Sequence, residues 1–244
     1  MEWRERDGIR WLEAELPGAR AAFSTRIGGV SEAPYEALNV GILTGDERDS
    51  VRENRNRLAS ALGRDPEGVV MARQVHGNEL HRHDAPQEPR VYAEAVRSPY
   101  EGDAHSTDKG DLTPLVIVAD CLPVALAGAG GVAMAHCGWR GLASGIVAEA
   151  AKAIEAEAAA VGPGIGPCCY EVGEEVLSEF ADIEGVARGR MLDLPAVATA
   201  LLERAGVTVT ESSDLCTKCN PDLFFSHRRD GARTGRQAGL AWTE

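Results

Sequence analysis

Two apolar runs joined by a glycine-rich turn constrain the fold of this chain more than any other feature. Residues 122–127 (LPVALA) and 131–136 (GVAMAH) flank the sequence Gly-Ala-Gly-Gly. Short apolar runs on either side of such a turn predict a β-hairpin. A two-residue loop pairs Gly128 with Gly131, and a four-residue loop gives the same register. The face on which each hairpin side chain lies follows from this pairing.

This register brings two metal-binding side chains to one face of the hairpin. Counting outward from the turn, His136 lies opposite Pro123, and Cys121 stands two residues before Pro123. Side chains two residues apart share a face, so Cys121 and His136 are diagonal neighbours with Cα atoms roughly 7–8 Å apart. Both side chains can then reach a single ion at ~2.0–2.3 Å.

A third ligand is needed to complete a metal site. His76 is the best candidate, because it ends a predicted strand over residues 68–76 and precedes a glycine; His81 and His83 are less constrained. Two imidazoles and one thiolate leave a fourth zinc position open, which is typical of catalytic zinc. From the residues alone, the alternative is a buried free cysteine and a strand-end histidine bonded within the core.

The remaining pattern indicates one α+β domain over residues 1–244 with mixed central β-sheets. Strands and helices are interspersed without a strict βαβ rhythm. Ser50 and Glu53 form a Ser-x-x-Glu capping box, and Gly63 supplies a stop signal. The predicted helices are 49–63, 141–159, 173–181 and 193–205, and the further predicted strands are 112–120 and the apolar segment AGLAW near the C-terminus.

Charge and composition exclude several function classes. The net charge of −13 disfavours binding to nucleic acid or to anionic membrane surfaces. No apolar run approaches the ~20 residues needed to span a bilayer, and the charged N-terminus does not resemble a signal peptide. We therefore expect a cytoplasmic protein. Its six cysteines are then reduced thiols or metal ligands rather than a disulfide framework.

Six motifs in fixed order resemble one known family. They are FSTRIGGVSEAPYEALNVG, RQVHG, ADCLPVAL, AHCGWRG, GPGIGPCCYEVG and FFSHRRDGARTGR, and they extend from residue 23 to residue 236. Together they resemble the multicopper polyphenol oxidase (laccase-like) family of YfiH type, whose members are regarded as zinc-dependent purine nucleoside phosphorylases with adenosine deaminase activity. The resemblance implies an α+β fold related to the deamidase domain of cytotoxic necrotising factor.

The resemblance places zinc on His76, Cys121 and His136, in agreement with the hairpin register. It implies a purine nucleoside phosphorylase that converts adenosine, inosine or methylthioadenosine with phosphate to free base and ribose 1-phosphate. The expected partners are these small molecules, with the protein a monomer or homodimer. One alternative is copper-dependent phenol oxidation, as in the family's older name. Another makes Cys121 a nucleophile and His136 its base in an amide hydrolase acting on peptidoglycan precursors.

Several arginines are candidates for binding phosphate. Arg26 precedes two glycines whose amides can approach an anion, although it could equally bond loop carbonyls. Arg140 opens the helix predicted after His136, where free N–H groups favour anions. The family resemblance suggests that part of the arginine-rich segment 228–236, with Arg229 as our candidate, borders the active site. Asn39 orders the loop after Arg26 and is a further candidate for the substrate.

Two aspartates are further candidate site residues, and the cysteines other than Cys121 are interpreted from their spacing and strand position. Asp120 is a candidate for catalysis as a partner of an imidazole N–H, or else a buried cap of a neighbouring loop. Asp103 is suited to similar work. We interpret Cys137 as a core thiol facing away from His136. The pair Cys216 and Cys219 has C-x-x-C spacing, which could be half a structural zinc site or a redox pair. No second pair at ribbon spacing completes a zinc site, and Cys168 and Cys169 are not counted as ligands, so packing or incidental thiols are favoured.

Overall fold

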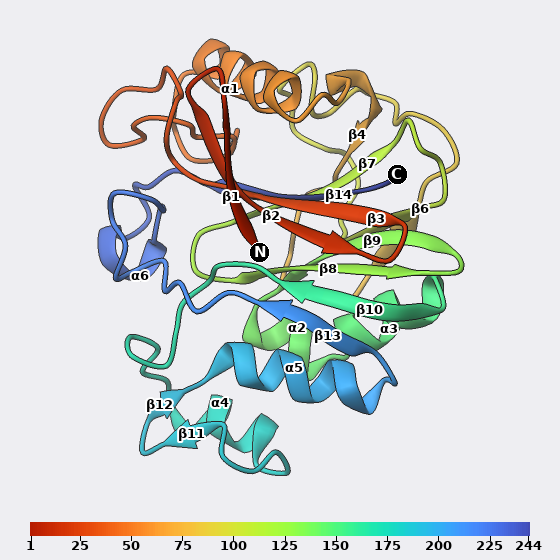
Figure 1. The fold of residues 1–244 in the computed structure, drawn as a ribbon. Coiled ribbons are helices and arrows are strands. Elements are labelled where there is room, and N and C mark those ends of the chain that lie inside the picture. The colour runs from red at the N-terminus through yellow and green to blue at the C-terminus, as the bar shows by residue number, and fades with distance from the viewer.

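Two six-stranded sheets stacked face to face form the centre of the protein in a computed structural model that describes residues 1–244 (Figure 1). In the first sheet all neighbouring strands are antiparallel except the last two, which are parallel. Its strands, in spatial order, are β1 (Glu2–Arg6), β2 (Ile9–Leu16), β3 (Ala19–Ser24), β14 (Gln237–Thr243), β7 (Thr113–Val118) and β4 (Val69–Val70).

The second sheet is also mixed, because its two outermost strand pairs are parallel and the inner pairs are antiparallel. Its strands, in spatial order, are β13 (Thr208–Ser212), β10 (Ala156–Val161), β8 (Leu122–Gly128), β9 (Gly131–Cys137), β6 (Ala104–Thr107) and β5 (Leu80–Arg82). A small hairpin of β11 (Ala187–Arg188) and β12 (Met191–Leu192) lies apart from both sheets.

Helices cover the outer face of each sheet (Figure 1). On the first sheet lies α1 (Arg48–Ala61), followed by the 3₁₀ turn η1 (Pro66–Gly68). On the second sheet lie α2 (Trp139–Ala143), α3 (Ile146–Ala153) and α5 (Leu194–Arg204). The short helices are α4 (Glu174–Leu177), η2 (Ser178–Phe180) and α6 (His227–Asp230). None of the helices is long and apolar enough to cross a membrane.

Each interface between these layers has its own apolar core. Leu58 of α1 packs with Trp11 and Leu115 of the first sheet. Small residues dominate the interface between the two sheets, where many alanines surround Phe23 and Met134. The largest cluster lies between the second sheet and α2, α3 and α5. The chain is therefore a mixed α+β domain with two mixed sheets, as the sequence pattern predicts.

The hairpin that the sequence predicts is confirmed. β8 and β9 pair antiparallel, with Gly128 opposite Gly131 and Pro123 opposite His136. The helix predicted at 193–205 and the final strand are also present. The predicted helix at 173–181 forms as α4 followed by η2.

The predicted helix over residues 141–159 is helical only as far as Ala153 and is wrong beyond it. It breaks at Gly145, whose φ is +89°, into α2 and α3, and residues 156–161 form β10. Alanine favours helices in isolation. Here β10 is hydrogen-bonded between β8 and β13, and its last four residues are buried, so burial in the sheet outweighs helix propensity.

Two further expectations need correction. The helix α1 begins at Arg48 without a side-chain cap, so the Ser50–Glu53 capping box does not form; Glu53 instead accepts a hydrogen bond from Arg57. The strand predicted over 68–76 pairs with β7 only at Val69–Val70. Beyond that point the side chain of Gln74, and not the backbone, is hydrogen-bonded to β7.

Candidate metal centre and its cavity

His76 stands on the loop that leads from β4 to β5. The amide of Gln74 donates from Nε2 to the carbonyl of Ile117 and accepts the Ile117 N–H at Oε1, both at 2.8 Å. A side chain thus takes the hydrogen bonds that a longer β4 would make with β7. Two residues later the backbone turns, with φ of +63° at His76, and the imidazole is exposed on the cavity wall.

The buried carboxylate of Asp103 organises this loop. Its Oδ2 accepts the backbone N–H groups of Val75 (3.0 Å) and Gly77 (2.9 Å). Its Oδ1 accepts the N–H of His76 (2.9 Å) and Nδ1 of His136 (2.8 Å). One carboxylate therefore fixes the backbone at one candidate ligand and the ring of another, and it leaves Nε2 of His136 for a metal.

The charge of Asp103 is stabilised by these contacts. Burial raises the pKa of its carboxyl, but the hydrogen bond and charge of His136, with the amides of Gly77 and Val75, outweigh burial and lower that pKa below its usual value. The carboxylate is thus ionised when His136 donates to it.

Cys121 lies at the turn between β7 and β8. The preceding residue, Asp120, has φ of +90°. Its Oδ1 accepts the Thr217 hydroxyl and its Oδ2 accepts the backbone N–H of Arg228, both at 2.6 Å. Of the two alternatives for Asp120, the structure has the loop cap, because both carboxylate oxygens hold the neighbouring segments. Asp120 borders the cavity without contacting an imidazole N–H in this arrangement.

The three predicted ligands come together. The ligating atoms of His76, Cys121 and His136 lie within 4.8 Å of one another, and the two imidazole rings meet edge to face with centroids 4.8 Å apart. A Cβ on Gly138 would stand 3.0 Å from the Cys121 sulfur and 3.1 Å from Cδ2 of His76, so only glycine leaves these side chains their room. Two imidazoles, one thiolate and a carboxylate that orients an imidazole fit a zinc ion.

Charge coupling prepares Cys121 to bind a metal. Burial raises the pKa of its thiol. The charges of His136 and His76, and hydrogen bonds from their rings, outweigh burial and lower that pKa to about 6. Burial lowers the pKa of His136, whereas the Cys121 thiolate and Asp103 raise it to about 9. The metal-free protein thus holds a thiolate–imidazolium pair. The thiolate is the ligating form, and metal binding releases the imidazolium proton.

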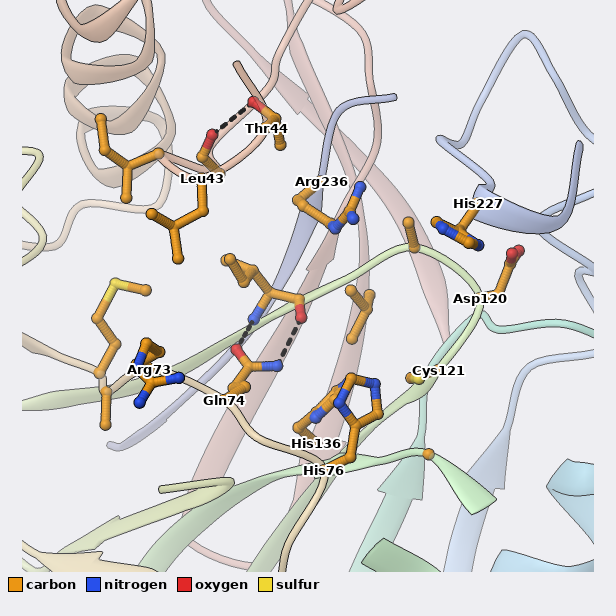
Figure 2. Close-up of a pocket in the computed structure, with 18 of the residues that line it drawn as sticks. Leu43, Thr44, Arg73, Gln74, His76, Asp120, Cys121, His136, His227 and Arg236 are labelled. Carbon is orange, nitrogen blue, oxygen red and sulfur yellow. Dashed lines mark hydrogen bonds between the residues drawn. The ribbon is translucent and has the colours of Figure 1, made fainter. Parts of the chain in front are cut away.

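A cavity of about 510 Å³ opens beside these residues (Figure 2). Apolar side chains such as Met71, Val96 and Ile117 form part of its wall, and Trp139 and Tyr170 also border it. Its only acidic lining residue is Asp120. The basic lining is large for a chain of net charge −13, and it consists of Arg55, Arg73, Arg97, Arg140, Arg228, Arg236 and His227. The cavity is therefore suited to an anionic ligand.

Arg236 is the arginine best placed to meet such a ligand. Its Nη1 donates to the carbonyls of Thr234 (3.0 Å) and Gly235 (2.8 Å), and its guanidinium projects into the cavity (Figure 2). Burial lowers its pKa, although Cys121 and Asp120 nearby act to raise it. The sequence singled out the segment containing Arg236, but nothing in the pattern distinguishes this arginine from Arg229.

Arg55 is a cavity residue that the sequence analysis missed. Its guanidinium is buried and donates to the carbonyls of Val40 (2.9 Å), Val91 (2.9 Å) and Tyr92 (3.1 Å), while Nη2 has no partner. Burial lowers its pKa to about 10. Arginine is rarely fully buried, but the sequence gives no sign that this position of α1 faces a cavity.

Three predicted substrate-binding residues lie outside the cavity. The guanidinium of Arg26 donates to the carbonyls of Glu36 (2.7 Å) and Pro221 (3.0 Å) and stacks over Phe225, which is the structural alternative stated above. Arg229 is bound to backbone carbonyls and to Asp230. Both guanidinium groups therefore hold loops in place.

The third of these residues is Asn39. Its Nδ2 donates to Asp46 (2.8 Å), and its Oδ1 accepts the N–H groups of Gly41 (3.0 Å) and Arg236 (2.9 Å). Asn39 thus orders its loop, and it also positions the backbone of the arginine that projects into the cavity.

The fourth predicted residue, Arg140, does border the cavity, and its side chain is exposed and stacks on Trp139. The helix that it opens has only five residues, so a long helix dipole does not support a phosphate there. Cys137 is fully buried among apolar residues, as the alternation of β9 predicts.

Comparisons with known proteins identify the family of this chain. The family model described as multi-copper polyphenol oxidoreductase laccase matches residues 20–244. Purine nucleoside phosphorylases of Streptomyces coelicolor and Escherichia coli (YfiH) are 39% and 37% identical, over 93% and 92% of this chain and 96% and 94% of their own lengths. The chain belongs to the YfiH-type purine nucleoside phosphorylase family.

The YfiH family also shares the observed fold. The crystal structure of YlmD from Geobacillus stearothermophilus superposes with a TM-score of 0.85 at 33% identity, covering 99% of this chain and 98% of that one. A hypothetical protein YfiH of Bacillus licheniformis gives a TM-score of 0.86 at 29% identity, covering 99% of both chains.

Proposed function

We propose that this chain is a zinc-dependent purine nucleoside phosphorylase that also deaminates adenosine. The observation that carries the proposal is the position of the His76–Cys121–His136 cluster on the wall of one arginine-rich cavity. Relatives named purine nucleoside phosphorylases over almost the whole chain length support it. The proposed substrates are adenosine, inosine and methylthioadenosine with inorganic phosphate.

The cavity matches such substrates in size and lining. Its volume of about 510 Å³ is ordinary for a small-molecule site, which typically has ~300–1,000 Å³. The apolar wall at Met71, Val96 and Ile117 offers contacts for a purine base. Arg236 and Arg140 supply planar donors for two phosphate oxygens. Base and phosphate would thus be held together in a single cavity.

In phosphorolysis the bond between the base nitrogen and C1′ of the ribose breaks, and a phosphate oxygen bonds to C1′. The electron pair leaves with the base, whose nitrogen then takes a proton. Arg236 and Arg140 would hold the phosphate dianion against C1′, so that the reaction occurs between preoriented groups. A zinc ion held by His76, Cys121 and His136 would supply Lewis acidity beside the substrate. Asp103 keeps His136 oriented throughout.

Deamination needs water in place of phosphate: water adds at C6 of the purine and ammonia leaves. This difference separates the two reactions experimentally. We expect zinc-loaded protein to convert adenosine with phosphate to adenine and ribose 1-phosphate, and to form inosine without phosphate. Product chromatography measures both. No turnover of any of the three nucleosides by zinc-loaded protein would contradict the proposal.

Arg236→Gln tests the phosphate site. We expect a KM for phosphate raised at least tenfold, because a charged hydrogen bond contributes about 1.5–3 kcal/mol. Deamination, which uses no phosphate, should change less. Arg26→Gln is the matched control, since its guanidinium holds carbonyls outside the cavity. An equal loss in both reactions for Arg236→Gln would argue against a phosphate-binding role.

A second candidate function has an observation of its own. Asp103, His136 and Cys121 form a series of carboxylate, imidazole and low-pKa thiol, which is also the arrangement of thiol-dependent amide hydrolases. A thiolate bound to zinc is a poor nucleophile, so the two functions respond oppositely to metal. Chelation abolishes the proposed phosphorylase activity, whereas it would expose Cys121 and activate a thiol hydrolase.

The identity of the metal is tested separately. Zinc suits two imidazoles and a thiolate, and copper can use the same ligands. Metal analysis of the purified protein, with phenol oxidation measured after loading with copper and with zinc, distinguishes the phosphorylase from a polyphenol oxidase. We propose zinc, with the protein acting in the cytoplasm as a monomer or homodimer.

A further inference from the structure

Four cysteines outside the cavity come together at the surface. Cys168 and Cys169 lie on the loop after β10, and Cys216 and Cys219 lie on the loop after β13. Their sulfur atoms all lie within 4.8 Å of one another. The sequence offered no second pair at ribbon spacing to complement the C-x-x-C pair. The adjacent pair Cys168–Cys169 supplies it through the fold.

The distances suit a shared metal ion rather than a disulfide. The Cys219 sulfur is 3.6 Å from that of Cys168 and 3.4 Å from that of Cys169. A disulfide bond measures ~2.05 Å, so these sulfurs are not bonded. Four sulfurs at ~2.3 Å from one zinc ion, arranged tetrahedrally, lie about 3.8 Å apart. The cluster is therefore close to the size that such an ion requires.

The surrounding backbone is arranged as it is around a metal-bound sulfur. The N–H of Gly166 donates to the Cys216 sulfur at 3.3 Å, and the N–H groups of Lys218 and Cys219 are directed to the same sulfur. Amides that point at a thiolate stabilise its charge and orient it for the metal. A Cβ on Gly166 would stand only 3.3 Å from the Cβ of Cys216 and 3.5 Å from the Cys168 sulfur, so glycine permits this close approach.

We propose that Cys168, Cys169, Cys216 and Cys219 bind a second zinc ion, in a closed four-thiolate site with a structural role. Four protein ligands fill the tetrahedral coordination of zinc and leave no position for substrate. Binding exchanges thiol protons for the metal, so each cysteine becomes a thiolate and its proton is released to solvent. The site is separate from His76, Cys121 and His136 and shares no ligand with them.

The four-cysteine site lies next to two parts of the cavity wall. Thr217, inside the C-x-x-C turn, donates to the Asp120 carboxylate at 2.6 Å, and Asp120 precedes Cys121. Tyr170, directly after Cys169, borders the cavity. A zinc ion joining the two loops would fasten both of these contacts, so the second metal stabilises the wall of the first.

Metal stoichiometry tests the proposal with full-length protein purified under reducing conditions. We expect two zinc ions per chain in the wild type by elemental mass spectrometry. Cys121→Ser and the double variant Cys216→Ser/Cys219→Ser should each retain one. Cys137→Ala is the matched control, because it removes a buried thiol outside both clusters, and it should retain two.

Cobalt substitution identifies the ligands. Cys121→Ser leaves the four-cysteine cluster intact, so the result does not depend on whether the double variant folds. Loaded with Co²⁺, Cys121→Ser should show the intense visible bands and sulfur-to-metal charge transfer of a tetrahedral tetrathiolate site. Metal-free Cys121→Ser, four freely alkylated thiols in native zinc-loaded protein, or a disulfide within the cluster under reductant would each overturn the proposal.

Discussion

Asp103→Asn tests whether a single carboxylate holds the metal centre together. The wild-type side chain accepts four hydrogen bonds, two at each oxygen. Asparagine keeps one accepting oxygen and presents an NH₂ group to donors at the other. Two of the four donors therefore lose their acceptor in a buried position, and the charge that favours the other two is removed.

The size of the expected losses in stability and in zinc affinity follows from these contacts. A hydrogen bond to a charged group contributes about 1.5–3 kcal/mol, so losing two lowers the free energy of unfolding by about 3 kcal/mol or more. Loss of the bond to Nδ1 of His136 also frees the ring to rotate. Losing such a partner weakens metal binding about 10–100-fold. We therefore expect both a less stable protein and a weaker zinc site.

Urea unfolding of the metal-free protein measures the first effect, and competition with a chromophoric zinc chelator measures the second. Asp46→Asn is the matched control. The carboxylate of Asp46 accepts three hydrogen bonds, from Ser31, Asn39 and Glu47, but contacts no candidate ligand. The Asp46→Asn variant should be less stable than the wild type but should bind zinc with the same affinity. Wild-type zinc affinity in Asp103→Asn would refute the reasoning.

Three other predictions concern the same region. Gly138→Ala should weaken zinc binding at least tenfold, because its Cβ would press on two ligands, whereas Gly77→Ala, with contacts at 3.7 Å, should not; equal affinities would contradict this. Gln74→Ala should raise the KM for nucleoside by releasing the His76 loop, with a near-normal unfolding midpoint as the check that the core persists. The free energy of unfolding should fall as pH drops from about 6.5 to about 4, because burial lowers the pKa of His83 to about 4 and that of the fully buried His105 further. Both are neutral when folded and take up protons when unfolded. The expected loss is about 3 kcal/mol or more, because the fully buried His105 alone contributes about 1.4 kcal/mol per pH unit over most of this range and the partly exposed His83 adds less. Urea titrations at several pH values measure it, and stability independent of pH in this range would contradict it.

The sequence predicted the hairpin and two ligands because their geometry is local. A turn of fixed length determines the register, and the register determines the face on which Cys121 and His136 lie. His76 was identified from its motif, but the sequence did not reveal what holds His76 in position. Gln74 must bond to Ile117, forty-three residues along the chain, and no pattern near His76 reveals that contact.

The sequence could not tell which of its candidate arginines faces the cavity. Arg26, Arg229 and Arg236 all stand beside glycine or in a basic segment, yet only Arg236 projects into the cavity. The difference lies in which backbone carbonyls each guanidinium meets, and those carbonyls belong to distant loops. The four clustered cysteines were missed for the same reason, because two loops about fifty residues apart bring them together.

The alanine-rich segment illustrates a second limit. Local propensity favours helix at residues 156–161, but the neighbours β8 and β13 take this segment into the sheet. Between the two sheets, Ala158 and Ala160 of this strand pack with other small side chains of the interface. Tertiary burial thus decided what propensity alone could not.

The central place of β14 in the first sheet has a consequence for biosynthesis. This strand pairs with β3 on one side and β7 on the other, yet it follows every other strand in the chain. While a ribosome still holds these residues, the first sheet is split in two, and Arg236 has not reached its wall. A nascent chain can assemble the β8–β9 hairpin early, but the side of the cavity that carries Arg236 waits for the last strand to be released.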